Sequence, residues 1–366
     1  MTGTPLAMFG TVKHDLHRLR RSAVNNFFSK KSIYDIEYFI QARTKQMCEF
    51  MQKQLDRDGV VEVRTNFLAY STDIICGHAF HEQRNLLDDE DSARKWRETI
   101  SAVALLTPIA RQLPWLLPLS LKIPIGVWNL VAPPLGRVVA FQQDMHNQAI
   151  TTINQIPEAT LDDGTSKGTM PTISEGLEID DSVTATKRPT VFRTILLSRL
   201  PPNEKSSQRL AQEGYGLVAA GGETCSRTLT SAVYYVLANK ERVIPRLQEE
   251  LKTVMPTADA SVGLKTLENL PWLTAVIRET LRLMALLIAR VPLVSPDKAL
   301  TYGDYTIPPG FPVSMSLADV LHDPKIFPEP LKFRPERWLP ENPHLERINR
   351  FYVPYGKGPR ACIGLK

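Results

Sequence analysis

The last twelve residues, 355–366 (YGKGPRACIGLK), place one cysteine among closely spaced glycines and cations. Arg360 precedes Cys362 by two residues, and Gly364 follows it by two. Nearby cations and unpaired backbone N–H groups lower the pKa of a thiol and favour the thiolate, which is the form that binds metal. Glycine also lets a flat ligand come close to the backbone. The stretch predicts a metal-binding thiolate loop, and taken alone it leaves open a free cysteine in a glycine-rich tail.

Read as aromatic-x-x-Gly-x-Arg-x-Cys-x-Gly, the stretch resembles the haem-binding loop of the cytochrome P-450 family, with Tyr355 where relatives usually have Phe. In that family the cysteine is the proximal iron ligand, and its thiolate favours O–O cleavage. The resemblance therefore implies that Cys362 binds haem iron. It also implies that Arg360 meets a haem propionate and that Tyr355, Gly358 and Gly364 belong to the haem-binding loop.

The composition is that of an ordinary globular protein, with 366 residues, 43% hydrophobic and 23% charged. The net charge of +5 is a mild basic bias that does not by itself indicate nucleic acid. The chain has four cysteines, which are far apart and form no Cys-x-x-Cys pair: Cys48, Cys76, Cys225 and Cys362. This spacing argues against a zinc site and against a disulfide framework.

No secretory signal or membrane anchor is expected at the start, because residues 1–11 are short, lack a long apolar run and lead into a basic segment. The most apolar region, residues 100–141, contains three cations and six prolines. A spanning helix needs about 20 predominantly apolar residues, so this region does not predict one. Buried core helices and a surface helix pair that dips into a bilayer both remain open.

Residues 11–31 are rich in cations and predict a helix with a solvated basic face. Apolar residues recur in this segment at helical spacing: Leu16, Leu19, Ala23 and Phe27. The segment looks like the family's C helix, which often carries Trp-x-x-x-Arg for the propionates. His17 and Arg21 occupy those two positions, so the resemblance assigns both to haem binding. The surrounding cations could also receive an acidic reductase.

A long helix is expected after Pro201-Pro202 and runs to about Leu237, with AAGGET at residues 219–224 in its middle. Two glycines inside a helix cost about 1 kcal/mol each against alanine, which indicates a functional or close-packing reason. The stretch is similar to the family's Ala-Gly-x-Glu-Thr signature. The resemblance implies that the helix opens at Gly221 and Gly222 over the distal haem face, and that Glu223 and Thr224 deliver protons there.

The same region also fits a dinucleotide fingerprint, Gly214-x-Gly216-x-x-Ala219, which would indicate a nicotinamide or flavin enzyme. That fingerprint requires a strand before it and a helix after it. Residues 204–213 are polar and helical in character, which counts against this alternative.

Residues 270–284 predict a helix on which Glu279 and Arg282 share a face, because they stand three apart. About fifty residues later, FRPERW at 333–338 resembles the family's Pro-Glu-Arg-Phe motif, with Trp338 for Phe. The resemblance implies that Glu279, Arg282 and Arg337 form a buried charge triad with a structural role. Relatives often bind a propionate through an arginine at the position of Leu293, so here Arg290, Arg21 and Arg360 are expected to suffice.

The composition of two further segments predicts their local structure. Residues 301–316 predict a β-hairpin whose strands are joined by a Pro-Pro-Gly turn. Residues 157–190 are rich in Asp, Gly, Ser, Thr and Pro and predict a mobile surface loop.

The implied fold is mainly α with a small β portion, as one partial P-450 domain over residues 1–366. The family's N-terminal elements and its helix after the cysteine are expected to be missing. The chain is similar to fungal members of the trichodiene-oxygenase type, which implies a haem-thiolate monooxygenase acting on an apolar secondary metabolite, a terpenoid or a polyketide. Electrons would come from NADPH through a separate cytochrome P-450 reductase.

The alternative function is a truncated, non-catalytic remnant of such an enzyme. The family usually resides at the endoplasmic reticulum membrane, with peripheral contact. A chain without an anchor would be cytoplasmic.

Overall fold

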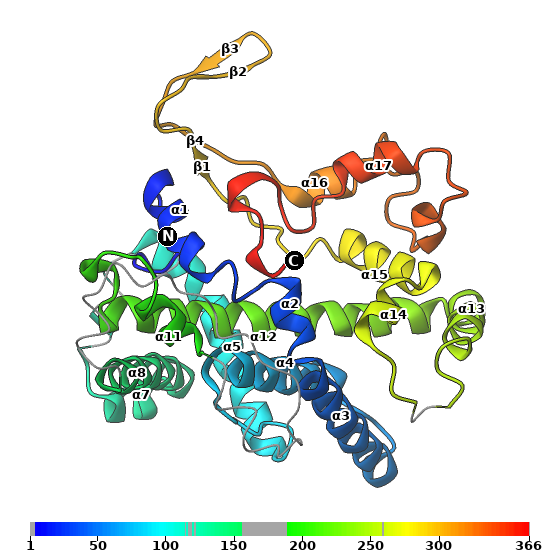
Figure 1. Ribbon diagram of the computed structural model, residues 1–366, viewed down its shortest axis with the longest axis horizontal. Helices are drawn as coiled ribbons and strands as arrows, with labels where there is room; N and C mark the ends of the chain where they lie inside the picture. Colours follow the sequence, from blue (N-terminus) through cyan, green and yellow to red (C-terminus); the bar gives the residue numbers. More distant parts are fainter. Residues whose placement is uncertain are drawn as a thin grey trace. The chain divides into compact units, whose positions relative to one another are not determined.

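The computed structural model describes residues 4–113, 115, 119–120, 122–155, 189–257 and 260–365 (Figure 1). The mobile loop expected at 157–190 lies outside the described residues, apart from its last two positions. The part of the chain that the structure describes is mainly helical, with four short strands, so the expected fold class is confirmed.

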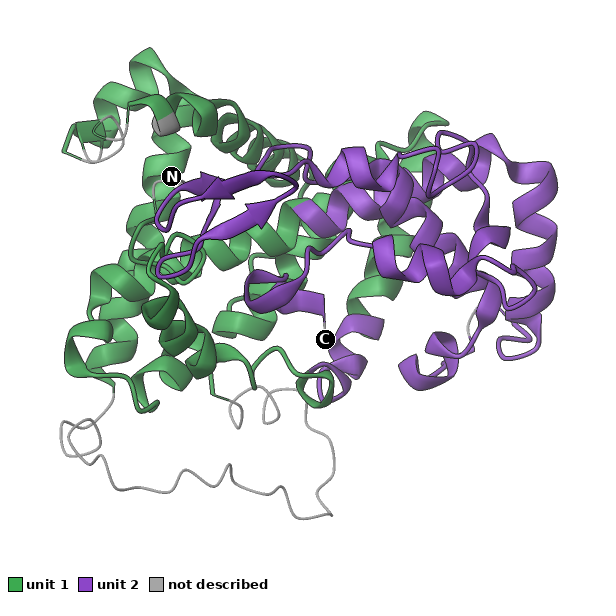
Figure 2. Ribbon diagram, turned by 90° about the horizontal axis from the view of Figure 1, so that it is seen from above, with its two compact units in different colours: residues 1–32, 42–223 green, residues 33–41, 224–366 purple. Residues whose placement is uncertain are grey.

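Figure 2 shows the chain divided into two compact units. Unit 1 comprises Met1–Ser32 and Ala42–Glu223, and unit 2 comprises Ile33–Gln41 and Thr224–Lys366. The long helix α12 (Ser207–Ala238) belongs to both units, because unit 1 ends at Glu223 and unit 2 resumes at Thr224. The expected single domain stays a prediction.

Unit 1 is helical, and α8 packs against α5, α7 and α11, while α4 packs against α5 and α11. Two further helices, α2 and α3, contain residues of both units, as α12 does. The elements of this part are α1 (His14–Val24), α2 (Lys30–Tyr34), α3 (Glu37–Asp58), α4 (Val63–Phe80), α5 (Glu90–Gln112), α7 (Ile125–Val131), α8 (Pro133–Asn154), α11 (Val191–Leu196), the 3₁₀ turn η2 (Pro202–Glu204) and the first half of α12.

A buried ion network ties α1 to the start of α12. Arg20 donates to both Glu204 oxygens, at 2.6 Å to Oε2 and 3.0 Å to Oε1. Arg209 donates to Glu204 Oε2 at 3.1 Å and to Glu213 Oε2 at 3.3 Å, and the backbone N–H of Met8 also donates to Glu213. The Arg20 guanidinium lowers the pKa of Glu204, so this pair gives stability that is lost as pH falls through the lowered pKa.

The network corrects the expected solvated basic face of residues 11–31 at Arg20, which is buried, whereas Lys13 and Arg18 are exposed. The buried residues of α1 are His17, Arg20 and Val24, whereas Leu19 is 39% exposed. A buried guanidinium is tolerated only when it is paired, and Glu204 provides that pairing from 184 residues away. Helical periodicity within the segment alone could not reveal this partner.

Unit 2 has its core where α13, η3 and α14 pack against α15. The core cluster includes Trp272, Phe327, Phe333, Trp338 and Ile348. The elements are the second half of α12, α13 (Lys240–Lys252), α14 (Leu264–Glu268), α15 (Pro271–Met284), β1 (Leu293–Val294), β2 (Leu300–Tyr302), β3 (Tyr305–Ile307), β4 (Pro312–Val313), α16 (Leu317–Leu321), η3 (Pro335–Trp338), α17 (Leu345–Phe351), η4 (Gly358–Arg360) and η5 (Ile363–Leu365).

The start of α15 follows from its sequence. Pro271 stands at the first turn, where a missing N–H costs nothing. The free N–H groups of Trp272 and Leu273 donate to the Glu250 carboxylate of α13, at 2.7 and 2.8 Å. A carboxylate at a helix N-terminus is favoured by the positive end of the helix dipole. The helix that carries Glu279 and Arg282 is therefore anchored at its beginning.

The hairpin exists, but its turn was placed wrongly. Strands β2 and β3 pair antiparallel, with Tyr302 opposite Tyr305. The turn is therefore at Gly303 and Asp304, where Gly303 takes a φ of +56° that suits glycine in a two-residue hairpin. The Pro308-Pro309-Gly310 stretch instead leads to β4, which pairs with β1. Proline has no N–H to donate to a ladder, so it ends β3.

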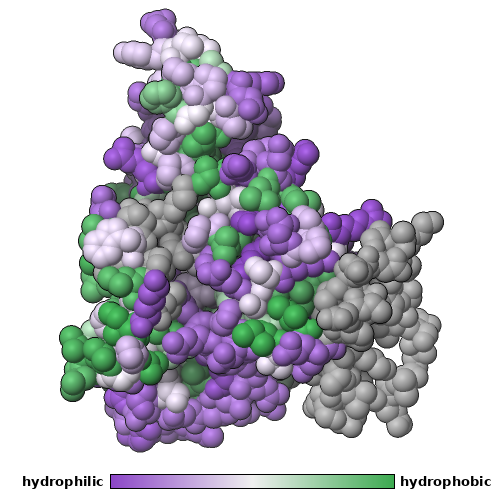
Figure 3. Space-filling model, turned by 90° about the vertical axis from the view of Figure 1, so that its left-hand side faces the viewer, coloured by the Kyte–Doolittle hydropathy of each residue, from purple (hydrophilic) through white to green (hydrophobic). Residues whose placement is uncertain are grey.

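Unit 1 also carries an apolar surface on α7, which has no buried residue. Leu130 is 86% exposed and Val131 72%, and Leu105 on α5 is 73% exposed. The side of the molecule that carries α7 and α8 in Figure 1 faces the viewer in Figure 3, where hydrophobic residues (green) form patches among hydrophilic ones. Among the described residues no helix is both long and apolar enough to cross a bilayer.

Candidate functional site

The cysteine loop is a closed turn in unit 2. Cys362 lies between η4 and η5, and its backbone N–H donates to the carbonyl of Tyr355 at 2.9 Å. Gly356 and Gly358 have φ values of +70° and +79°, in the region that favours glycine. The glycine at position 358 is thus required by the backbone. The loop leaves Cys362 exposed.

The surroundings of the sulfur are small and open. Gly364 lies beside it, since a Cβ built there would be 3.8 Å from Cys362 Sγ. Burial raises the pKa of Tyr355, and negative charge at Cys362 and at Cys225 raises it further. Tyr355 is therefore close to both cysteines. Cys225 follows Thr224 on α12, so the loop and this part of α12 border the same region of unit 2.

These residues fit a haem. Among the described residues no group of three or more His, Cys, Asp or Glu could hold a metal ion. A lone cysteine suits a metal that brings its other ligands with it, as haem iron does with the four nitrogens of the porphyrin. In the part of α12 that belongs to unit 2, Thr224 and Cys225 are small and exposed, which leaves room for a flat group. Arg360 is half-buried in η4, and burial lowers the pKa of its guanidinium.

The charge triad expected from sequence is brought together in unit 2. Glu279 and Arg282 are 0% exposed and Arg337 is 7% exposed. The Glu279 carboxylate accepts five hydrogen bonds of 2.9–3.2 Å, from Arg282 Nε and Nη2, Arg337 Nε, Trp338 Nε1 and the backbone N–H of Arg334. The last two donors were not expected, because indole and backbone partners leave no charge signal in the sequence.

Both arginines also hold backbone carbonyls of the segment after the β-strands. Arg282 Nη1 donates to the carbonyl of Leu321, and Arg337 Nη2 donates to that of Glu329, each at 2.8 Å. Burial lowers the pKa of Arg337, while the charge of Glu279 opposes that shift. The cluster thus fixes α15, η3 and the segment between them as one assembly.

The glycines of the AAGGET stretch have a packing reason. Helix α12 is unbroken over residues 207–238, so the local opening implied at Gly221 and Gly222 is absent. A Cβ at Gly221 would lie 3.0 Å from Ile75 Cγ1, and one at Gly222 would lie 2.7 Å from Thr72 Oγ1. Both neighbours belong to α4. The glycines allow α4 and α12 to approach closely within unit 1.

Gly222→Ala is expected to destabilise the protein by about 1–3 kcal/mol, because overpacking forces neighbours to shift. Thr72 cannot move easily, since it is fully buried and accepts a hydrogen bond from Trp96 Nε1 at 2.8 Å. Gly216→Ala is the matched control on the same helix, because nothing lies within 4 Å of its Cβ position. That change should stabilise by up to about 1 kcal/mol. Denaturant unfolding would measure both, and equal effects would contradict the packing explanation.

Glu223 and Thr224 differ in their surroundings. Glu223 Oε1 pairs with Arg64 Nη2 of α4 at 3.2 Å, and its side chain is 19% exposed. Thr224 is exposed. The pairing of Glu223 was missed, since nothing in the sequence relates positions 64 and 223.

The remaining expected haem-binding residues are placed as follows. His17 and Arg21 lie on α1 in unit 1, with His17 buried and Arg21 half-buried. Arg290 lies in unit 2, exposed, in the segment between α15 and β1. Their roles toward haem stay predictions.

The dinucleotide fingerprint is not a phosphate-binding turn here. Residues 214–219 lie inside α12 and follow its own first turns instead of a strand, so the strand–turn–helix geometry that the fingerprint requires is missing. Gly214 instead gives room to a neighbour, because a Cβ there would be 2.8 Å from Phe192 Cζ.

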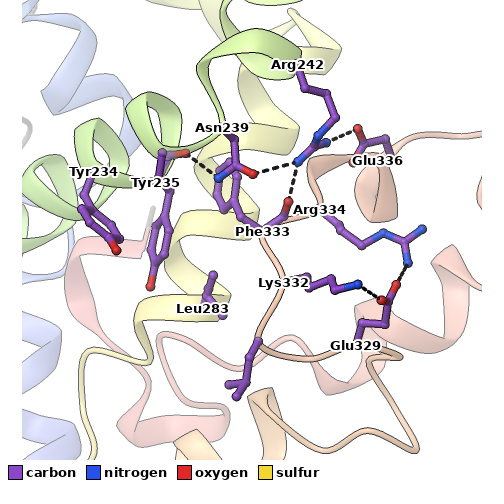
Figure 4. Close-up of a pocket in the computed structure, with 12 residues that line it drawn as sticks. Tyr234, Tyr235, Asn239, Arg242, Leu283, Glu329, Lys332, Phe333, Arg334 and Glu336 are labelled. Atoms are coloured by element: carbon purple, nitrogen blue, oxygen red, sulfur yellow. Dashed lines mark hydrogen bonds and ion pairs between the residues drawn. The ribbon is translucent and has the colours of Figure 1, made fainter.

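A pocket of about 660 Å³ lies elsewhere in unit 2 (Figure 4). Tyr234 and Tyr235 from the end of α12 line one side, and Tyr235 stacks on Phe333 with ring centroids 5.1 Å apart. Its charged groups are paired with one another: Arg242 with Glu336, and Lys332 and Arg334 with Glu329. The pocket does not include Cys362 or Thr224.

Comparisons with known proteins agree on one family. A model of the family described as "Cytochrome P450" matches residues 7–366. The chain is 33% identical to cytochrome P450 monooxygenase MO6277 of Ascocoryne sarcoides, over 99% of this chain and 68% of that protein. It is 32% identical to tryptophan 6-hydroxylase fscE of Fusarium equiseti (100% and 67%) and 31% identical to cytochrome P450 monooxygenase TRI4 of Fusarium sporotrichioides (98% and 64%). The chain thus spans about two thirds of the length of these relatives.

Proposed function

The chain belongs to the cytochrome P450 family, and from that premise we propose that it is a haem-thiolate monooxygenase of fungal secondary metabolism. The observation that carries the proposal is the exposed Cys362 in a loop closed on Tyr355 and bordered by the small residues of α12. A bound haem supplies electron transfer and oxygen chemistry, which the thiolate tunes.

The protein's own residues would hold the haem in three ways. Cys362 would ligate its iron, Gly364 keeps a side chain away from the sulfur, and Gly358 supplies the positive φ that the loop requires. Arg360 would pair with a propionate, because a guanidinium matches carboxylate geometry. Thr224 and Cys225 would border the opposite face.

Proton delivery would fall to Glu223 and Thr224. A carboxylate can take a proton from water and pass it on, and a hydroxyl can both accept and donate. Arg64 holds the Glu223 carboxylate on its α4 side, so delivery requires the carboxylate to leave that pair or to exchange its proton through water. The pair is partly exposed and therefore weak enough to open.

Glu223→Gln is expected to lower turnover roughly a hundredfold, the usual loss when an acid–base group is removed. Haem binding should be unchanged. Arg64→Gln is the matched control, because it breaks the same ion pair and keeps the carboxylate. Turnover and its solvent deuterium isotope effect would be measured in both. Equal losses would mean that the ion pair, and not proton transfer by Glu223, sustains turnover.

The substrate would be an apolar secondary metabolite, a terpenoid or a polyketide, taken up near a membrane. Apolar side chains are exposed after α15, including Leu287 and Ile288, and on α7, including Leu130 and Val131. Such surfaces suit an apolar substrate and peripheral contact with a bilayer. Electrons would come from NADPH through a separate reductase, which the basic residues of α1 such as Arg18 would help to dock.

The test is the reduced carbon-monoxide difference spectrum of the chain supplied with haem. A strongly red-shifted Soret band would show thiolate ligation, and turnover would then be assayed with a reductase. A less shifted band, or none, would favour the alternative of a non-catalytic remnant.

A further inference from the structure

Trp338 contacts both the buried charge cluster of Glu279, Arg282 and Arg337 and Tyr352, which precedes the cysteine loop. Its indole Nε1 donates to Glu279 Oε2 at 3.0 Å. Its ring lies 4.8 Å from that of Tyr352, at an interplanar angle of 60°. The side chain therefore joins a carboxylate of α15 to the C-cap residue of α17.

Arg278 reinforces this contact. Its guanidinium lies 4.2 Å from the Trp338 ring centroid and 4.7 Å from that of Tyr352. The same group donates to Asn349 Oδ1 on α17. A cation over two aromatic faces is attracted to both, so the three side chains form one stack.

The stack leads directly into the cysteine loop. Tyr352 is the C-cap residue of α17, and the carbonyl of the next residue, Val353, accepts the N–H of Gly356 at 3.0 Å. The carbonyl of Tyr355 then accepts the N–H of Cys362 at 2.9 Å. A shift of Tyr352 would therefore be passed to the loop through hydrogen bonds only a few residues away.

We propose that Trp338 is a positioning residue for Cys362. The hydrogen bond from its indole N–H to Glu279 fixes the Trp338 side chain, and the stack of Trp338 with Arg278 and Tyr352 fixes the position of the cysteine loop. The proposal rests on the proposed function in that Cys362 is the haem ligand. The tryptophan at this position does more than fill space, because phenylalanine cannot donate to Glu279.

The competing explanation is core packing alone, since Trp338 is 5% exposed and belongs to the core cluster of unit 2. Trp338→Phe separates the two, because it keeps a ring and removes the N–H. In this variant Glu279 Oε2 still accepts a hydrogen bond from Arg282 Nε at 2.9 Å, so that oxygen keeps a donor. Trp272→Phe is the matched control: Trp272 is 2% exposed in the same cluster, and its Nε1 donates only to the carbonyl of Val243, at 3.4 Å.

The first measurement is amide hydrogen exchange of Gly356 and Cys362 in the chain without haem. Loss of a hydrogen bond to a charged group predicts roughly tenfold faster exchange at both amides in Trp338→Phe. Trp272→Phe should change them no more than it changes the rest of unit 2. The second measurement is the rate of haem loss from the loaded protein to an excess of apomyoglobin, expected to be roughly tenfold faster in Trp338→Phe than in Trp272→Phe.

Tyr352→Leu provides a second route to the same question, because it removes the ring that connects the stack to the loop and leaves the bond between Trp338 and Glu279 in place. It should also speed exchange at Gly356 and Cys362. Equal effects of the two tryptophan variants, or unchanged loop amides in Trp338→Phe and Tyr352→Leu, would overturn the proposal. If the wild-type chain binds no haem, the proposed function fails, and the exchange measurement still decides the role of Trp338.

Discussion

Replacing Cys362 by serine is expected to remove the red-shifted Soret band of the reduced, carbon-monoxide-treated protein and to abolish turnover. Serine is close to cysteine in size, and the backbone N–H at this position still donates to Tyr355, so the loop should keep its shape. Its hydroxyl is a hard ligand that stays protonated near neutral pH. It cannot donate electron density as a thiolate does. The spectrum and a turnover assay would measure the two losses.

Two matched variants control for this change. Cys225→Ser alters another exposed cysteine that lies near Tyr355, and Cys48→Ser alters an exposed cysteine on α3. Both should keep the red-shifted band. Retention of the band in Cys362→Ser, or its loss in Cys225→Ser, would contradict the assignment of Cys362 as the ligand.

Glu279→Gln is expected to destabilise the protein by about 3–5 kcal/mol, because removing one partner of a buried ion pair leaves uncompensated charge. Arg282 is fully buried and Arg337 nearly so, and both point their donors at this carboxylate. The amide nitrogen of glutamine would face some of those donors and accept from none. Denaturant unfolding followed by circular dichroism would give the free-energy change.

The matched control is Glu346→Gln, which removes a carboxylate paired with Arg350 at 2.9 Å on α17, where both side chains are largely exposed. Its effect should stay within about 0.5 kcal/mol. A loss below about 1 kcal/mol for Glu279→Gln would mean that the cluster is not what holds α15 to η3.

Part of the fold was readable in advance, because local patterns carry it. The helix expected at residues 270–284 is α15, Pro271–Met284, since a proline start, a 3.6-residue apolar period and no internal breaker agree there. The pairing of Glu279 and Arg282 follows from their spacing of three on that helix, and both are buried as expected. A hairpin was expected within residues 301–316, although its turn lies at Gly303 and Asp304 rather than at Pro308-Pro309-Gly310.

Other features depended on partners far away in the chain. Arg20 looked like part of a solvated basic face, and it is buried because Glu204 meets it. Gly221 and Gly222 looked like a local opening of the helix, and they are glycines because Ile75 and Thr72 of α4 come so close. In each case the sequence shows the residue type, but not the distant residue whose contact accounts for it.

The sequence by itself determined the family and the mainly α fold, because its short motifs resemble those of the cytochrome P450 family, and from the same resemblance it predicted Cys362 as the iron ligand. Only the tertiary structure decided that Trp338 donates to Glu279 and that Arg64 pairs with Glu223, which lie 59 and 159 positions apart. The physical reason is how far apart along the chain the interacting residues lie. Helical and turn patterns record neighbours a few residues away, whereas a buried hydrogen bond is selected by whichever donor the fold brings within about 3 Å.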